Sequence, residues 1–446
     1  MAQSKKQAHL NVFIRGSGHH GGAWKHPDSD PGSDLGLDYY ANLARIAERG
    51  LLDSLFMADN YSGLGRRLEP FTLLSALAAL TKHIGFIATV STTYNDPFHV
   101  ARKFASLDHL SNGRAAWNIV TGHSQADADN FGKPGHPEVT KRYDIGDEFV
   151  EVAKQLWDSW EEDALVYDRK TDTTILADKV HEIRFKGNYY SVKGPLNIPR
   201  PPQGYPVLVQ AGSSESGREL AAKSAEVIFT AQQTLGAAKE FYTDVKSRLI
   251  KYGRTPDQLL IMPGLGAVVA DTEAEAKDLE DELNALVDTK KSLKRLSNYF
   301  TVDLSEYSLD ALVPVDKSKP IGSLTNGITS RHEVVIDAAR RDKMTIRQFL
   351  SRSLGGHGHI TFTGSVIQVA DFIETWLREG GADGFNLLPP LFPSGLETFV
   401  DKVIPELQNR GLFRTAYEGT TLRENLGLAR PENSHKQLWA LGREAN

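Results

Sequence analysis

Short apolar runs alternate with amphipathic segments of helix length along most of the chain. Helix start signals mark the boundaries: Asp96-Pro97 supplies an N-cap and an N1 proline, and Thr272 with Glu275 forms a capping box. The apolar runs predict strands at residues 9–14, 55–58, 84–90, 115–120, 206–210, 227–231, 259–270 and 385–388. The segments between them predict helices at 38–50, 70–80, 96–112, 143–160, 213–224, 235–252, 272–286, 365–379 and 396–408.

Strands that are separated by helices need crossover connections, so the pattern predicts a parallel sheet. Eight such strands favour an α/β fold of the closed (β/α)8 TIM barrel type over an open sheet, with one domain spanning residues 1–446. Two stretches break the repeat, at about 161–205 after the fourth strand and its helix and at about 288–360 after the seventh. We expect both insertions to cover a site at the carboxyl ends of the strands, and 288–360 to close over it as a lid.

Composition removes several classes of protein. The 51 Lys and Arg residues against 57 Asp and Glu give a net charge of −6, which argues against a nucleic-acid binder. The absence of cysteine excludes disulfides, thiolate metal sites and a cysteine nucleophile. No run approaches the ~18 apolar residues of a membrane span, and no signal-peptide pattern follows Met1, so we expect a cytoplasmic protein without a membrane partner.

One apparent motif does not carry its usual function, and two other functional motifs are absent from the sequence. The segment 16–21 matches GxGxxG after a strand, but Gly22, Pro27 and Pro31 follow where a dinucleotide site needs a helix, so a flexible loop is the better interpretation. No metal motif is expected, because the histidines fit no metal-ligand pattern such as HExxH: His19, His20, His26, His357 and His359. The sequence also has no GxSxG elbow, which argues against an α/β-hydrolase.

The segment 210–218 between a strand and a helix is a candidate phosphate site. Its small residues Gly212, Ser213 and Ser214 let backbone N–H groups approach an anion at a helix N-terminus. The alternative is that Ser213 or Ser214 only caps the helix. Because phosphate sites recur at such turns in barrels, phosphate binding is the favoured interpretation.

Polar residues also end three other strands. Asp59, Asn118 and His123 each lie at or just beyond the carboxyl end of an apolar strand. Each of them alone fits a satisfied structural hydrogen bond. Their convergence on one barrel mouth favours a ligand site.

Seven segments together resemble the bacterial luciferase-like flavin-dependent monooxygenases. The similarity is closest to the branch with the nitrilotriacetate and EDTA monooxygenases, dibenzothiophene sulfone monooxygenase and long-chain alkane monooxygenase. It covers about residues 9–425 and rests on Phe56–Asp59, Ser91–Tyr94, Leu110–Thr121, Asn130–Gly132, Arg142–Asp144, Gln210–Ser214 and Ala382–Asn386.

The resemblance implies a barrel that uses FMN as FMNH2, together with O2, to oxidise a small organic substrate. It implies a separate NAD(P)H-dependent flavin reductase as transient partner, and a homodimer or homotetramer. The implied FMN contacts are Asp59, Gly122, Tyr143, Ala211, Gly212, Ser213 and Ser214, with Thr92 and Asn118 near the ring.

Two histidines are the candidate acid–base groups in this reading. His123 follows Gly122, where many relatives have serine, so only a backbone contact to FMN is expected at Gly122. His123 would face flavin and substrate, and His20 in the first loop is the second candidate. The chemistry resides in the cofactor, which fits a sequence that has no nucleophile motif.

Three other functions remain open. The same barrel could use deazaflavin F420 for hydride transfer, could bind flavin without catalysis, or could be an aldolase- or isomerase-like barrel with a sugar phosphate. A polar mouth with His19, His20 and His123 argues against the non-catalytic protein, and the lack of an isolated lysine after a strand argues against a Schiff-base aldolase. The substrate is not fixed, because relatives oxidise aminopolycarboxylates, sulfones, thioethers or alkanes on one scaffold.

Overall fold

The computed structural model describes residues 7–63, 65, 67–122, 124–320, 329–356 and 358–435, and the side chains of 329–331 are outside that description. Two histidines of the sequence analysis, His123 and His357, therefore lie outside the described residues.

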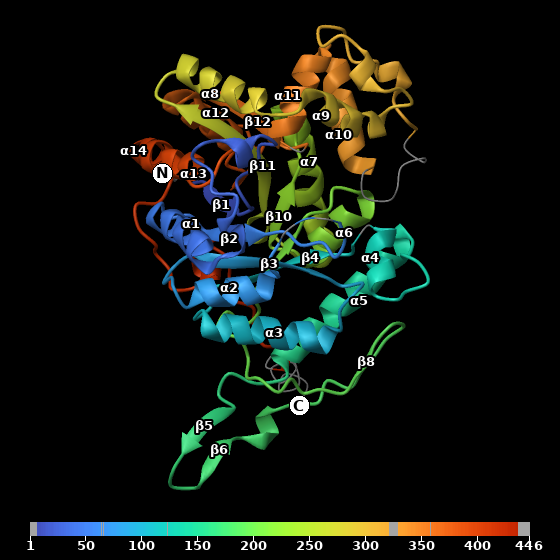
Figure 1. The fold of residues 1–446 in the computed structure, drawn as a ribbon. Helices are drawn as coiled ribbons and strands as arrows, with labels where there is room; N and C mark the ends of the chain where they lie inside the picture. The colour runs from blue at the N-terminus through green and yellow to red at the C-terminus, as the bar shows by residue number, and fades with distance from the viewer. Residues whose placement is uncertain are drawn as a thin grey trace.

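Eight parallel strands close into a barrel, as predicted (Figure 1). Each strand pairs with the next one along the chain, β10 pairs with β11, and the last strand pairs back onto the first. The barrel strands are β1 (His9–Phe13), β2 (Ser54–Met57), β3 (Gly85–Ser91), β4 (Ala115–Val120), β9 (Val207–Gln210), β10 (Val227–Thr230), β11 (Leu260–Ala270) and β13 (Gly384–Leu387).

Successive strand residues point alternately into the barrel and toward the helices. Leu10 and Val12 pack with the surrounding helices, whereas Phe56, Phe229 and Met262 belong to the cluster inside the barrel. The same inner cluster includes Leu422, Leu426 and Leu428 from the C-terminal segment. These leucines close the amino-terminal end of the barrel, because Leu422 lies against the first residue of β3. A ligand therefore has access from the carboxyl ends of the strands.

Helices surround the barrel, and their starts follow the sequence signals. The Asp96 carboxylate accepts hydrogen bonds from the N–H groups of Phe98 and His99, and Thr272 and Glu275 form the predicted capping box. The helices outside the insertions are α1 (Leu37–Arg49), α2 (Pro70–Ala78), α3 (Pro97–Leu110), α4 (Gln125–Asn130), α5 (Val139–Asp158), α6 (Glu215–Ser224), α7 (Leu235–Arg248), α8 (Glu273–Ala285), α12 (Val366–Arg378), α13 (Ser394–Thr398), α14 (Ile404–Asn409) and α15 (Leu422–Asn425). None of the described helices is both long and apolar enough to cross a membrane.

One strand was not predicted. The structure has β12 (Ile360–Ser365) where the sequence analysis passes directly from an insertion to a helix. It pairs in parallel with residues 265–270 of β11, which run on past the pairing of β11 with β13. A strand as long as β11 exceeds what a barrel strand needs, and its outer half requires a partner for its backbone groups.

The insertion 161–205 holds two small hairpins, β5 (Leu165–Asp168) with β6 (Thr173–Ile175) and β7 (Phe185–Lys186) with β8 (Ser191–Val192). It leaves the C-terminal end of α5 and leads into the amino-terminal end of β9. The Trp160 indole N–H donates to the Leu196 carbonyl at the end of α5. The β5–β6 hairpin lies away from the barrel mouth (Figure 1), whereas Tyr190, next to β8, reaches the Thr92 carbonyl at the mouth over 3.5 Å. The prediction that this insertion covers the site is therefore wrong for the β5–β6 hairpin and stays a prediction for the rest.

The insertion 288–360 is a small helical body with its own apolar core. It contains α9 (Thr289–Leu296), α10 (Thr329–Arg341) and α11 (Ile346–Gly356). Leu293, Ile336 and Phe349 are among its buried residues. The N–H of Gly21, in the loop after β1, donates to the Leu354 carbonyl over 3.1 Å. The insertion therefore stands beside the carboxyl mouth, and its closure as a lid remains a prediction.

A buried ion pair fixes the amino-terminal end of the barrel. Asp53, just before β2, contacts the Arg414 guanidinium, and both side chains are less than a tenth exposed. Asp53 also accepts a 2.6 Å hydrogen bond from the N–H of Leu10. Burial alone would raise the pKa of Asp53, but Arg414 and His9 hold it below its ordinary value. The charge thus joins β1, β2 and the C-terminal segment.

Replacing Arg414 by Met should lower the free energy of unfolding by about 3–5 kcal/mol, because it leaves a buried carboxylate unpaired. With its pKa depressed in the folded state, Asp53 stabilises the protein above pH ~4, and that stability is lost as the pH falls through the folded pKa. Without Arg414 the pKa of Asp53 rises above its unfolded value, so protonation then favours the folded state and the stability deficit of the variant should shrink as the pH falls. Urea denaturation followed by circular dichroism at several pH values measures both effects.

Arg340→Met is the matched control, because Arg340 pairs with Asp337 where both side chains are more than half exposed. It should change stability by less than about 0.5 kcal/mol. Equal stability losses in the two variants would contradict a structural role for the buried pair.

Candidate active site

The loop after β9 and the first turn of α6 form a concave cradle with a tyrosine from α5. The Ser214 hydroxyl caps α6 by accepting a 3.2 Å hydrogen bond from the Gly217 N–H, and donates to the Tyr143 hydroxyl over 3.5 Å. A Cβ on Gly212 would lie 2.4 Å from the Gln210 side-chain nitrogen and 2.9 Å from the Tyr143 hydroxyl. Glycine therefore keeps the cradle open. Backbone N–H groups of a helix N-terminus and two hydroxyls fit an anion.

The structure thus brings together residues of the candidate phosphate site that are far apart in the sequence. Tyr143 meets Gly212 and Ser214, whereas the Ser213 hydroxyl lies 3.3 Å from the Thr230 hydroxyl at the end of β10. Ala211 is exposed at the same turn. The sequence analysis left open whether Ser213 or Ser214 caps the helix, and the structure assigns the cap to Ser214.

Amide groups inside the barrel have unfilled hydrogen-bonding capacity among the described residues. The Asn118 amide nitrogen donates to the Thr89 hydroxyl over 2.8 Å, but its oxygen, in a side chain 2% exposed, has no partner. Asn386 on β13 is 1% exposed, and neither end of its amide has a partner. Buried polar atoms are normally paired, so these atoms indicate a place for a ligand or ordered water.

Asp59 follows β2 and is half-buried at the mouth. Burial raises the pKa of this carboxyl to about 6, with nearby Glu69 adding to the rise. A 2.9 Å hydrogen bond from the Asn60 N–H and the charge of Arg67 oppose it. Asp59 therefore changes its charge close to neutral pH, a property of groups at functional sites.

The loops after β3 and β4 are tied to each other at the mouth. The Thr92 N–H donates to the Val120 carbonyl over 2.9 Å, and the Thr93 hydroxyl donates to the Thr121 carbonyl over 2.7 Å. Gly122 has φ +70°, and a Cβ there would lie 3.3 Å from both Tyr94 and His136. This left-handed backbone and close packing favour glycine at this position.

Only one of the two candidate acid–base histidines, His20, is among the described residues. His123 lies outside the described residues. His20 is 6% exposed, and burial lowers its pKa although the Asn284 side chain opposes this. Its Nδ1 accepts from the Gly22 N–H over 3.0 Å and its Nε2 donates to the Asn284 oxygen over 3.2 Å. These bonds fix the loop after β1 against α8, and a catalytic role for His20 remains a prediction.

Sequence reasoning missed His136. Its Nδ1 lies 2.5 Å from the Tyr94 hydroxyl, and its Nε2 lies 2.5 Å from the Arg142 guanidinium. Arg142 also donates to the Gly122 carbonyl. Tyr94 and Arg142 belong to segments that carry the family resemblance, but His136 lies in a loop without a motif, and only the fold brings it to them.

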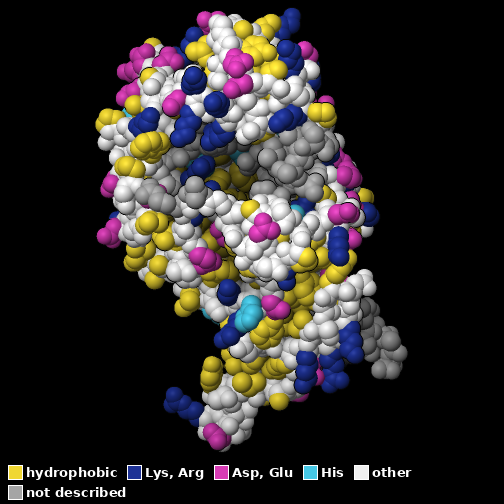
Figure 2. Space-filling model, turned by 45° about the vertical axis from the view of Figure 1, so that its right-hand side comes forward, with side chains coloured by type: hydrophobic (Ala, Val, Ile, Leu, Met, Phe, Trp, Pro, Cys, Tyr) yellow, Lys and Arg dark blue, Asp and Glu magenta, His cyan; other side chains and the backbone are white. Residues whose placement is uncertain are grey.

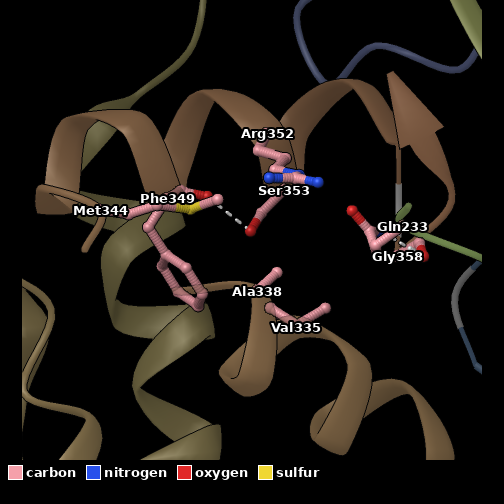
Figure 3. Close-up of a pocket in the computed structure, with 8 residues that line it drawn as sticks. All are labelled: Gln233, Val335, Ala338, Met344, Phe349, Arg352, Ser353 and Gly358. Atoms are coloured by element: carbon pink, nitrogen blue, oxygen red, sulfur yellow. Dashed lines mark hydrogen bonds between the residues drawn. The ribbon is translucent and has the colours of Figure 1, made fainter. Parts of the chain in front are cut away.

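A cavity lies under the helical insertion, between α10, α11 and the loop after β10 (Figure 3). Gln233 is 8% exposed, donates to the Gly358 carbonyl over 2.6 Å, and has no partner for its side-chain oxygen among the described residues. Arg352 lies across from it in Figure 3 and pairs with Asp342 over 3.0 Å. A larger cavity of about 730 Å³ between α8, α11 and β12 shares Gln233 and Arg352.

The molecule is hollowed on the side where these helices stand, and Figure 2 shows apolar surface inside the hollow with Lys and Arg side chains along its upper border. Other arginines of the insertion pair elsewhere or have side chains that are not described. Arg340 and Arg341 pair with Asp337 and Asp342 on the exposed surface of α10, and the side chain of Arg331 is not described. Arg352 is the arginine of the insertion that lines both cavities.

Comparisons with known proteins agree with this fold. The chain is 49% identical over 443 residues to N-acetyl-S-(2-succino)cysteine monooxygenase of Bacillus subtilis, covering 98% of this chain and 100% of the relative. It is 47% identical to nitrilotriacetate monooxygenase component A of Aminobacter aminovorans, covering 97% and 98% of the two chains.

A solved structure of a riboflavin lyase with modified FMN and riboflavin superposes with a TM-score of 0.83 at 30% identity, covering 96% of this chain and 97% of that one. The family model described as luciferase-like monooxygenase matches residues 18–384. The resemblance seen in the sequence is thereby confirmed, as is the prediction of an enzyme at the level of the family. The chain belongs to the luciferase-like monooxygenase family.

Proposed function

We propose that this protein is the oxygenase of a two-component system that binds FMNH2 from a separate NAD(P)H-dependent flavin reductase and uses O2 to oxidise a small organic substrate. The observation that carries the proposal is the anion cradle of Tyr143, Gly212 and Ser214 at the open end of the barrel. When bound, reduced flavin supplies the electrons and the reaction with O2. The word "component" in the name of the nitrilotriacetate relative supports a partner protein.

The residues present fit FMN. The cradle would hold one phosphate at the N-terminus of α6, and the unpartnered Asn118 oxygen would be available to accept a hydrogen bond from the flavin. Asp59 and Thr92 border the same mouth. Leu422, Leu426 and Leu428 keep water from entering through the amino-terminal end of the barrel, and this would protect a reduced flavin from unproductive reactions.

The substrate class we propose is a polycarboxylate with a carbon–nitrogen or carbon–sulfur bond. Nitrilotriacetate and N-acetyl-S-(2-succino)cysteine, after which two relatives are named, are both of this class. Arg352, which lines the larger cavity together with Gln233, would supply a cation for a substrate carboxylate.

The direct test is oxygen consumption and product formation with a flavin reductase, FMN and NADH. We expect consumption coupled to conversion of one of these two polycarboxylates, and dependent on this protein. Conversion with reduced deazaflavin F420 and no product with FMNH2 would favour the hydride-transfer alternative. No flavin binding at all would contradict both functions.

Replacing Arg352 by Gln should raise the KM for a carboxylate substrate by about tenfold or more with a smaller change in kcat, because a charge-assisted hydrogen bond is lost. Arg341→Gln is the matched control, since Arg341 pairs with the same Asp342 but lines neither cavity. Equal KM values for the two variants would remove Arg352 from substrate binding.

Replacing Ser214 by Asp should weaken FMN binding by at least about tenfold through repulsion of the phosphate. Aspartate is as good an N-cap as serine, so α6 should stay folded. Thr234→Asp makes the same kind of change at the cap of α7, in the next βα unit, and should leave the affinity unchanged. Flavin fluorescence titration measures the dissociation constants, and an unaffected Ser214→Asp variant would place the phosphate elsewhere.

The carboxyl of Asp59 should titrate with a pKa of about 6 in the ligand-free protein. Arg67→Met should raise this pKa by removing a positive charge, and Glu69→Gln should lower it by removing a negative one. Carbon-13 NMR of aspartate carboxyls, with Asp59→Asn to identify the signal, follows the titration. A signal that titrates near pH 4 would show that the carboxyl is well solvated.

A further inference from the structure

His136 connects two loops of the mouth through a chain of short contacts. From the loop before α5, its ring reaches the Tyr94 hydroxyl at Nδ1 and the Arg142 guanidinium at Nε2, each over 2.5 Å. Arg142 in turn donates to the Gly122 carbonyl. Tyr94 and Arg142 are 7% and 4% exposed, and His136 between them is partly exposed.

The contact with Arg142 fixes which ring nitrogen carries hydrogen. A guanidinium has only donors and keeps its charge in proteins, so His136 Nε2 must present its lone pair to it. Burial lowers the pKa of Arg142, whose ordinary value is so high that the group stays charged at neutral pH. A neutral imidazole with a bare Nε2 carries its hydrogen on Nδ1. His136 therefore donates from Nδ1 to the Tyr94 oxygen.

This arrangement leaves the hydrogen of the Tyr94 hydroxyl for an acceptor other than His136. The ring of Tyr94 is held on both sides, because it stacks on Phe131 with centroids 4.9 Å apart and meets Tyr61 edge-on at 6.0 Å. At Gly122 a Cβ would lie 3.3 Å from both Tyr94 and His136. The hydroxyl and the Gly122 backbone are thus set together at the mouth.

We propose that His136, as the neutral Nδ1–H tautomer, is a positioning residue that holds the Gly122 loop through Arg142 and orients the Tyr94 hydroxyl as a hydrogen-bond donor to the ligand. The assignment rests on the proposed function, in which the Gly122 backbone contacts FMN. His136 itself touches neither flavin nor substrate in this account.

Protonation of His136 breaks this arrangement. Histidine side chains gain their proton between about pH 8 and pH 5. A protonated ring has no lone pair for Arg142 and places a second positive charge beside it. In the described part of the chain, the groups near it include the Tyr94 hydroxyl, the Gln125 oxygen that accepts from the His136 N–H, and the carboxylates Asp127 and Asp129 of α4, which act on Tyr94. Acid pH therefore releases Gly122 and weakens the site.

A glutamine at position 136 keeps the hydrogen bonds of the neutral histidine but cannot gain its positive charge. In His136→Gln the side-chain oxygen accepts from Arg142 and the amide nitrogen donates to Tyr94, and neither group titrates. His136→Ala removes both bonds. His99→Gln, at an exposed position on α3, is the control for a histidine change elsewhere.

The first measurement is the nitrogen-15 NMR signal of the His136 ring without flavin, assigned by its loss in His136→Gln. We expect a protonated Nδ1 and a bare Nε2 at pH 8. The opposite tautomer, or a ring already doubly protonated at pH 8, would overturn the proposal. This readout is independent of flavin, so it separates failure of this assignment from failure of the proposed function.

The second measurement is the dissociation constant of FMN at pH 8 and pH 5.5. The FMN phosphate and Asp59 also titrate in this range, so each variant is compared with the wild type at the same pH. We expect His136→Gln to bind FMN as tightly as the wild type at pH 8 and about tenfold more tightly than the wild type at pH 5.5. We expect His136→Ala to bind FMN about tenfold more weakly than the wild type at pH 8. His99→Gln should follow the wild type. If His136→Gln loses as much FMN affinity between pH 8 and pH 5.5 as the wild type does, the proposal is overturned.

Discussion

Closure of the parallel barrel is the constraint on which the site depends. Because β10 pairs with β11 and β13 pairs with β1, the carboxyl ends of all eight barrel strands meet around one opening. Leu422, Leu426 and Leu428 fill the opposite end. The loops after β2, β3, β4 and β9 therefore converge, although they come from distant parts of the sequence. The ion pair of Asp53 and Arg414 stabilises the end where no ligand enters, so the other end is free to carry function.

In the proposed function, the polar groups of the mouth serve a cofactor that brings its own chemistry. The cradle at α6 offers hydroxyls and backbone N–H groups for an anion, and the barrel interior offers amides without partners. Burial raises the pKa of Asp59 to about 6, and His136 contacts both Tyr94 and Arg142. Such a site binds, orients and excludes water rather than attacking a substrate itself. This division of labour explains why the sequence carries no nucleophile motif.

The eight barrel strands and most helices could be predicted because local signals and the global fold agree. The alternation of apolar runs with capped helices specifies both, as at Asp96 and Thr272. The unpredicted β12 exists because β11 continues past the barrel, and the length of that apolar run was the signal that a further strand was needed. The position of the β5–β6 hairpin could not be predicted from the polar composition of the insertion 161–205, since nothing local says whether it lies at the barrel mouth.

The site was predictable only where residues follow strands directly. Asp59, Gly122 and Ser214 each come just after a strand, so parallel geometry alone places them at the mouth. His136 comes from a loop between two helices and acquires its meaning from Tyr94 and Arg142, which no spacing in the sequence reveals. The shape of the helical insertion beside Gln233 likewise arises from packing within 288–360.

The most direct measurement is a crystal structure of the protein with FMN. The account predicts the phosphate within hydrogen-bond distance of the Tyr143 hydroxyl, the Ser214 hydroxyl and the backbone N–H groups at the start of α6, with the ring in the barrel mouth toward Asn118. A phosphate bound at another loop, or a flavin outside the barrel mouth, would contradict it.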